Sequence, residues 1–452
     1  AAQKRYDEDL VKRTAKGLTA KQQFPVIKNY LYNMILKSLD AYHSGSSIDH
    51  KLTTLLHHAE ILYNRGLFDQ SVKILNKAEK PAEKYERFSV LMEIMNWKFR
   101  IIKTASFHKI SEKEIDSLYQ EKKGIAEKIE NYQEFGWLHT KLMSKVLKKG
   151  WFARNPEEIS RDYDPILKHS LFKSEGNAIT YRSKIFYYVS KSIYYYLQGR
   201  AEDSYAYSSK LLQLFESNPE IAQSYPDDYI SGYVNAIFST MAMNRYAEAL
   251  QYIKKMQEFE PASVILHARI LSASLPELVI YNSSGRSAEV LDILPQFTSR
   301  IEKYKHMMSK QEVFYFYYNF ACLYFKFHRY REASHYLFNI INDTEVGFLP
   351  DIQANARRLT LMVHFELDTV ELLPYVLRST YRFLLQSRRL YKFESAIISF
   401  IKKLPGVDGR TLGGLFKELQ EELTALSKNA YEKRAIEYFG ILDWLRSKTD
   451  KK

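Results

Sequence analysis

A pair of helices joined by a tight turn recurs along this 452-residue chain at nearly constant spacing. Four of the predicted turns fall at residues 199, 244, 285 and 328, which are 45, 41 and 43 residues apart. A period of this length is typical of repeat architectures, in which each unit buries its apolar face against its neighbours. The pattern therefore predicts a chain of stacked helical hairpins with no sheet and with more than three quarters of its residues in helices.

The clearest unit runs from Glu312 to Ile341 and turns at His328. Helical spacing places apolar residues on one face of each of its two helices. The first helix contributes Tyr317, Phe320, Ala321 and Tyr324, and the second contributes Ala333, Leu337 and Ile340. We expect the two helices to approach most closely where Ala321 meets Ala333, because small side chains let helix axes come together.

This unit resembles a tetratricopeptide (TPR) repeat. The resemblance depends on Tyr317, Ala321, Tyr324, Tyr330 and Ala333. It implies a right-handed superhelical solenoid of antiparallel helix hairpins. A period near 43 residues exceeds the 34 of a standard TPR, so we expect irregular repeats with extended helices or linkers.

Further copies of the unit predict how the chain is organised. Residues 52–79 turn at Gly66, residues 185–216 at Gly199, and residues 230–261 at Asn244, while a weaker copy turns at Gly285. Repeats within 80–180 cannot be assigned individually, because their small residues are poorly placed. We predict an N-terminal lead-in and helix over 1–49, a repeat array over 50–403, and a glycine-rich loop (404–414) with capping helices over 404–452.

Composition limits the kind of protein this is. Apolar residues make up 46% and charged residues 26% of the chain, as in ordinary folded proteins. No apolar run reaches the length of a membrane helix, so we expect no membrane span. The single cysteine, Cys322, excludes an internal disulfide, and we interpret it as a buried, inert thiol. We expect a cytoplasmic protein. Because the sequence begins at Ala1 without Met, we also expect a missing upstream segment, and a periplasmic location stays open.

The motifs of common catalytic sites are missing from the sequence. The glycines of 404–414 lack P-loop spacing, and neither HExxH nor GxSxG occurs. His57 and His58 are adjacent and point about 100° apart on a helix, so they cannot share one metal. We therefore predict a non-enzyme without catalytic residues, metal ligands or cofactors.

The TPR resemblance implies a concave groove lined by the first helix of each repeat. Carried over by position, the groove residues are Tyr315, Tyr318, Asn319, Cys322, Phe325 and Lys326 in one repeat and Val234, Asn235 and Phe238 in another. Chaperone-binding TPRs hold a terminal carboxylate with Lys and Asn, but most of those positions carry other residues here. Aromatic residues in a groove favour binding of a peptide or helix, since they supply large contact area. An equal alternative is that these rings pack between the hairpins.

The formal charge of +13 is uneven. Residues 141–200 hold twelve Lys or Arg against five Asp or Glu, and residues 371–410 hold eight against three. The two basic patches comprise Lys145, Lys148, Lys149 and Arg154, and Arg382, Arg388, Arg389 and Lys392. Their interleaved aromatics also suit single-stranded nucleic acid. The sequence thus predicts a scaffold or adaptor that binds a protein or peptide, with an RNA- or ribosome-associated factor as the alternative; the oligomeric state stays open.

Overall fold

The computed structural model is all-α over the residues that it describes, of which 87% are helical and none lies in a strand. This confirms the expected helical content. The described residues are 24–43, 47–104, 110–151, 153, 155–261, 263–283, 287–343, 350–367, 372–386, 392–404, 407, 409–429, 432–433, 436 and 441–449.

The chain divides into two compact units, residues 1–129 and 130–452, and the division falls inside one long helix. In the first unit the described helices are α2 (Phe24–His43), α3 (Ile48–Asn64), α4 (Phe68–Lys84), α5 (Phe88–Thr104) and the start of α6 (Glu112–Lys149). The core of this unit comprises Leu52, Leu56, Leu75, Phe88, Leu91, Ile94 and Met95. The sequence predicted no boundary at residue 129; the predicted boundaries at 49/50 and 403/404 stay predictions.

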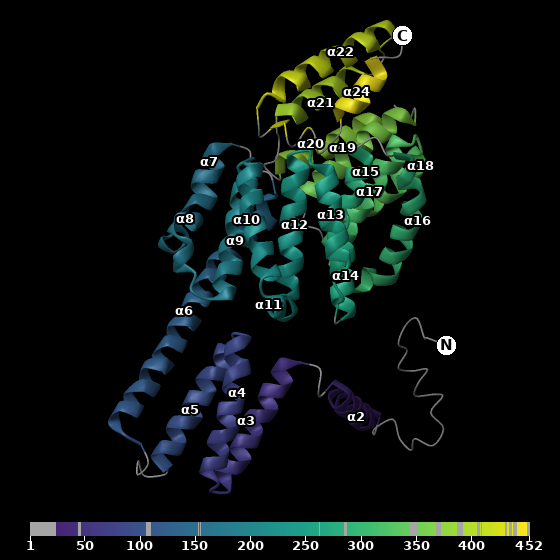
Figure 1. Cartoon of the computed structure of the whole chain (residues 1–452). Helices are drawn as coiled ribbons and strands as arrows, with labels where there is room; N and C mark the ends of the chain where they lie inside the picture. The colour runs from purple at the N-terminus through teal and green to yellow at the C-terminus, as the bar shows by residue number, and fades with distance from the viewer. Residues whose placement is uncertain are drawn as a thin grey trace. The chain divides into compact units, whose positions relative to one another are not determined.

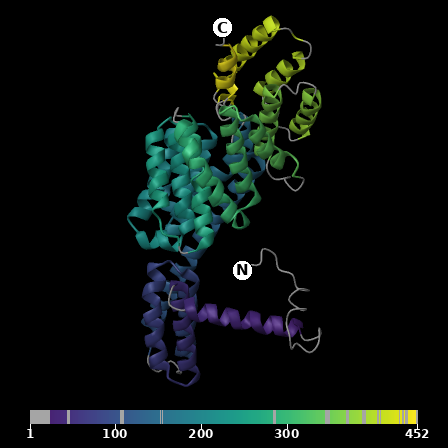
Figure 2. The ribbon, with the colours of Figure 1, turned by 90° about the vertical axis from the view of Figure 1, so that its right-hand side faces the viewer.

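The second unit continues from the end of α6 through short turns and further hairpins (Figure 1, Figure 2). Its first elements are α7 (Pro156–Glu158), the π-helical turn η1 (Ile159–Tyr163), α8 (Asp164–Leu167), η2 (Ser170–Lys173), η3 (Glu175–Asn177), α9 (Tyr181–Leu197), α10 (Ala201–Glu216), α11 (Pro219–Ser224), α12 (Pro226–Ala242) and α13 (Tyr246–Gln257). They are followed by α14 (Val264–Ala273), α15 (Pro276–Ser283), α16 (Ser287–Tyr304), η4 (Lys305–Met307), α17 (Lys310–Lys326), α18 (Tyr330–Ile341), α19 (Pro350–Glu366), α20 (Leu373–Gln386), α21 (Lys392–Lys403), α22 (Gly409–Leu426) and α24 (Ile441–Thr449).

Four predicted turns lie where the sequence placed them. The backbone is left-handed at Gly66 (φ 74°), Gly199 (φ 76°), Asn244 (φ 58°) and His328 (φ 58°). After each, the next backbone N–H donates to the carbonyl oxygen five residues earlier, as in Arg245 N to Thr240 O at 2.8 Å. This is the hydrogen bond that closes a helix in the Schellman motif. The predicted turn at Gly285 lies outside the described residues.

A fifth turn of the same geometry joins α4 to α5 at Glu86, with φ 50°. Arg87 N donates to Ala82 O at 2.8 Å. The sequence did not predict this turn, because Glu has no local preference for positive φ. The hairpins therefore begin to repeat within 80–180, before the 38-residue helix α6 interrupts them.

Small residues are buried at several of the positions predicted for close contacts within the hairpins. Ala321 of α17 and Ala333 of α18 are fully buried and belong to one core cluster that extends into the C-terminal helices. In the first unit, Ser71 Oγ donates to Ala59 O at 2.8 Å. Three buried serines link α9, α10 and α12. The hydroxyl of Ser204 on α10 lies 3.1 Å from that of Ser192 on α9 and 2.8 Å from that of Ser239 on α12. Such contacts draw neighbouring helices together without leaving a polar group unpaired.

The glycine-rich segment differs from its prediction. Gly409, Gly413 and Gly414 lie inside α22 rather than in a loop. If Gly413 or Gly414 carried a Cβ atom, no other atom would lie within 4 Å of it. Close packing therefore does not require glycine at either position.

Within the part of the chain that the structure describes, one window of 18 residues, Val264–Tyr281, has a mean hydropathy of 1.4, and 44% of it is buried. The window is divided between α14 and α15 by a turn at Ser274 and Leu275. A membrane-spanning helix needs about 20 continuous apolar residues, so this segment is only a weak indication of a span.

Candidate binding surfaces

The predicted groove residues of α17 lie largely within the protein. Tyr318 is only 2% exposed and belongs to the core cluster that α17 shares with the C-terminal helices. Tyr315 and Phe325 are partly buried against the same cluster. Asn319 donates its amide to Tyr315 O at 2.8 Å, an ordinary contact along one helix. The structure thus places this face of α17 against other helices instead of an open groove.

Cys322 and Lys326 lie on the same side of α17. Burial raises the pKa of the Cys322 thiol to about 12, which keeps it protonated and unreactive near neutral pH. Burial lowers the pKa of Lys326, and Asp443 of α24 opposes that shift. The C-terminal helix α24 therefore lies near the residues that were expected to bind a partner.

Glu366, at the end of α19, holds α24 in this position. One carboxylate oxygen accepts from Trp444 Nε1 at 2.7 Å and lies 2.6 Å from Lys448 Nζ. The other accepts from the Tyr330 hydroxyl at 3.2 Å. The contact joins residues 78 positions apart, so no sequence periodicity could have predicted it.

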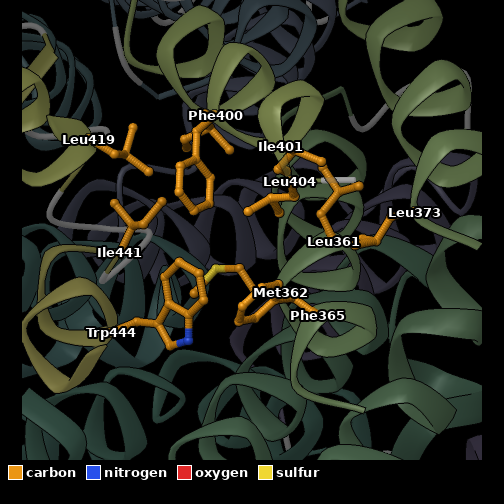
Figure 3. Close-up of a pocket in the computed structure, with 11 residues that line it drawn as sticks. Leu361, Met362, Phe365, Leu373, Phe400, Ile401, Leu404, Leu419, Ile441 and Trp444 are labelled. Atoms are coloured by element: carbon orange, nitrogen blue, oxygen red, sulfur yellow. The ribbon is translucent and has the colours of Figure 1, made fainter. Parts of the chain in front are cut away.

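The pocket in Figure 3 lies among α19, α21, α22 and α24 and is lined by apolar side chains. Phe365, Phe400 and Trp444 surround it with edge-on and tilted aromatic contacts to Phe416. The free space is about 10 Å³, which is roughly the space that one water molecule occupies. An apolar gap of this size is a packing imperfection and offers no polar group for binding a substrate.

The predicted groove residues of α12 are more accessible. Phe238 is 38% exposed, and its ring centre lies 6.3 Å from that of Tyr196 on α9. Asn235 is half-buried, and its carbonyl oxygen accepts from Ser239 Oγ at 2.7 Å. The structure does not bring Asn235 and Phe238 together with the predicted residues of α17 into one described site.

The first basic patch is partly neutralised by a buried carboxylate. Lys145, Lys149 and Arg161 all pair with Asp162, a residue of the π-helical turn η1. Burial alone would raise the pKa of Asp162, but hydrogen bonds from Arg161 and Lys149 outweigh it and lower the pKa to about 2. Lys148 is exposed, whereas Arg154 lies outside the described residues. Two cations of the predicted patch, Lys145 and Lys149, are therefore ion-paired within the protein, which a count of charges along the sequence could not show.

The second basic patch is only partly described. Arg382 on α20 and Lys392 at the start of α21 are exposed, while Arg388 and Arg389 lie outside the described residues. The backbone N–H groups of Lys392 and Phe393 donate to the carboxylate of Glu432, which caps α21.

Helix α2 has more exposed large apolar side chains than any other described element. Nine of its large apolar side chains are between 37% and 69% exposed: Val26, Ile27, Tyr30, Leu31, Tyr32, Met34, Ile35, Leu36 and Leu39. Four of its polar residues, Asn29, Asn33, Lys37 and Asp40, recur at intervals of four, four and three and form one narrow stripe, whereas Lys28 and Ser38 lie outside it. A helix was predicted within 1–49, but not that its apolar side chains would be left exposed.

Among the residues that the structure describes, no three His, Cys, Asp or Glu side chains gather closely enough to hold a metal ion. No protein-family model matches the chain, and no curated protein matches it either. The class of protein must therefore be argued from these surfaces.

Proposed function

We propose that this chain is a non-catalytic scaffold that binds a segment of a partner protein. The observation that carries the proposal is the exposed apolar surface of α2. Soluble chains seldom leave large contiguous apolar areas in water, and those that do generally use them to bind other molecules. A 20-residue helix is about 30 Å long, enough to pack along a partner helix or groove.

The polar stripe of α2 favours a protein over a lipid surface. Helices that lie on membranes carry a strongly charged polar face rich in Lys and Arg. The stripe of α2 has one Lys, one Asp and two Asn, and the whole helix adds only one further cation, Lys28. Packing against another apolar protein surface suits this arrangement better.

The hairpins support a TPR-like array as the body of the scaffold. Five turns share one geometry, and small residues occupy the close contacts in the hairpins of both units. We propose that these hairpins continue as a right-handed superhelix with irregular repeats. In this proposal the array positions the exposed surfaces, and the binding face is not confined to the residues of α17.

A cross-linking experiment on α2 tests the function. A photoreactive amino acid at Leu31 of the full chain is activated in extract of the native cell, and cross-linked proteins are identified by mass spectrometry. Because the variant replaces Leu31, the cross-linker is placed at Tyr30 for the comparison. The double substitution Leu31→Glu and Ile35→Glu should then lower the yield of the captured protein at least tenfold. The matched control, Asn29→Glu with Asn33→Glu, adds the same charges at the same spacing on the polar stripe and should retain capture.

Equal capture by both double variants would contradict binding through the apolar face. Capture that disappears after nuclease treatment would favour the second candidate, an RNA- or ribosome-associated factor. The exposed Tyr and Arg side chains of α20 are the observation that keeps this candidate open. A ratio of absorbance at 260 to 280 nm that stays high during purification would support it.

A further inference from the structure

Helix α20 carries a continuous stripe of exposed apolar and cationic side chains. Leu372, immediately before the helix, and Tyr375, Arg378, Arg382 and Leu385 follow one another at intervals of three, three, four and three residues. This alternation places them along one line on a helix surface. Leu372 is 50%, Tyr375 77% and Leu385 49% exposed, and both arginines are exposed as well.

The opposite face of α20 fixes the helix in place. Leu373, Leu377 and Leu384 are buried in the C-terminal core. Arg357 of α19 lies 4.8 Å from the ring centre of Phe383, and it donates to Ser379 Oγ at 3.1 Å. The exposed stripe is therefore presented by a held helix, which lowers the entropy lost when a partner binds.

The charge of the stripe is one-sided. The sequence of α20 contains two arginines and no acidic residue, and no described acid pairs with Arg378 or Arg382. Lys402 of α21 adds a third exposed cation and lies 5.4 Å from the ring centre of Tyr381. Asp368 and Glu371, the nearest acids before the helix, lie outside the described residues. A partner for this surface must bring negative charge.

We infer that the stripe on α20 binds an acidic amphipathic helix of a partner protein. Intervals of three and four residues are those at which two packed helices meet. The stripe extends for about 20 Å, since each helical residue advances about 1.5 Å, and this is the length of a four-turn partner helix. Leu372 and Leu385 at its two ends suit apolar side chains of such a helix, whereas a nucleic acid would gain little from aliphatic contacts.

This inference rests on the proposed function and specifies the chemistry of one partner segment. The partner helix would place Leu or Ile against Tyr375 and Leu385 and place Glu or Asp against the two arginines. Aromatic and arginine residues are the types that most often dominate interface energies. The acidic residues would also speed association by electrostatic attraction, more strongly at low salt.

Binding of a designed peptide to the full chain tests the inference. The probe is a fluorescent 18-residue helical peptide with Leu at helix-packing positions and Glu on both flanks, measured by anisotropy. Its control is a scrambled peptide of identical composition that has no apolar face. We expect micromolar binding of the first peptide and at least tenfold weaker binding of the second.

Two sets of variants separate the stripe from general charge. Arg378→Glu with Arg382→Glu should weaken binding at least tenfold, and Tyr375→Ala with Leu385→Ser should do the same without altering charge. The matched control, Lys417→Glu with Lys428→Glu, makes the same charge change at exposed positions of α22 and beyond its end and should change affinity less than threefold.

Three results would overturn the inference. They are no binding of the designed peptide, equal affinity for the scrambled peptide, and tighter binding of a single-stranded oligouridine than of the peptide. The last would make nucleic acid the partner of α20. None of these results depends on the cross-linking from α2, so the scaffold proposal can fail or survive independently.

Discussion

The surroundings of the His139 imidazole on α6 predict how the stability of the protein depends on pH. Its Nδ1 lies 3.0 Å from Ser190 Oγ, and its ring is 5.4 Å from that of Phe186. Burial lowers its pKa from 6.5 to about 4. The unfolded chain therefore takes up this proton at a higher pH than the folded chain does. The free energy of unfolding should fall as the pH drops from about 6.5 to about 4.

Comparison with His139→Gln isolates this effect, because the amide can keep the contact with Ser190 but does not titrate. Urea midpoints across pH 7.5 to 4.5 should show the advantage of the natural chain shrinking as the pH falls. Asp228, whose pKa burial raises to about 6, acts in the opposite direction but is common to both proteins. Parallel curves would show that His139 titrates normally.

Ala321 of α17 and Ala333 of α18 lie in one densely packed core cluster, in which a much larger side chain would be overpacked. Both residues are fully buried, so Ala333→Trp should lower stability by about 1–3 kcal/mol or more through overpacking. Phe338→Trp is the control, since Phe338 lies on the same helix and is 66% exposed. The melting temperature should fall for the first variant and stay nearly constant for the second. An equal response would mean that α17 and α18 do not pair at these residues.

Residue patterns predicted local geometry better than burial. Gly199, Asn244 and His328 could be identified as turns because each type tolerates positive φ locally. The burial of Tyr318 could not be predicted, since it depends on α19 and the C-terminal helices packing against α17. For the same reason, the partial burial of Tyr315, Asn319 and Phe325 could not be predicted from the spacing of α17, whereas Lys326 is exposed.

At the scale of the element, two glycines of the first unit allow a matched test of turn and helix. Gly66 closes α3 with φ 74°, whereas Gly124 lies within α6, and no atom lies near an added Cβ at either site. Gly66→Ala should therefore destabilise by about 1–2 kcal/mol through left-handed strain alone. Gly124→Ala should stabilise by about 0.5–1 kcal/mol, because alanine favours helix. Hydrogen exchange of α3–α5 and α6 amides in the full chain would measure both, and changes of the same sign would contradict the turn assignment.

The attachment of α24 depends on the carboxylate of Glu366. Glu366→Gln removes the charge that faces Lys448, and hydrogen bonds to charged groups contribute about 1.5–3 kcal/mol. Amides of residues 441–449 should exchange at least tenfold faster in this variant. Glu418→Gln, which breaks the exposed pair with Lys403, should have little effect. If the two variants behave alike, Glu366 does not hold α24.

Helices were predicted from the sequence more reliably than their lengths or neighbours. The helix predicted within 1–49 corresponds to α2, and the hairpin turning at Gly66 corresponds to α3 and α4. The 38 residues of α6 were not predicted as one helix. Hairpins that repeat about every 43 residues have a turn about every 21 residues, so one helix of this length does not fit the pattern. The Gly-rich run predicts a loop, whereas Gly409, Gly413 and Gly414 lie within α22.

At the scale of the whole molecule, the two units each bury an apolar core of their own. Exposed large apolar side chains also occur singly or in pairs on other helices, but they are most numerous on α2, and α20 carries an apolar and cationic stripe. The small apolar pocket of Figure 3 offers no comparable opportunity for a substrate. These exposed surfaces are the reason for proposing a protein-binding scaffold.

The proposal of a protein-binding scaffold is tested most directly by hydrogen exchange of the full chain. The exchange is measured for the chain alone and for its complex with the purified partner that cross-linking identifies. Amides of α2 should be among the most protected on binding, because a partner that covers its apolar face excludes water and suppresses local opening. Nuclease treatment should leave the protection unchanged. Protection that is absent from residues 24–43, or that disappears with the nuclease, would contradict a scaffold that binds protein through α2.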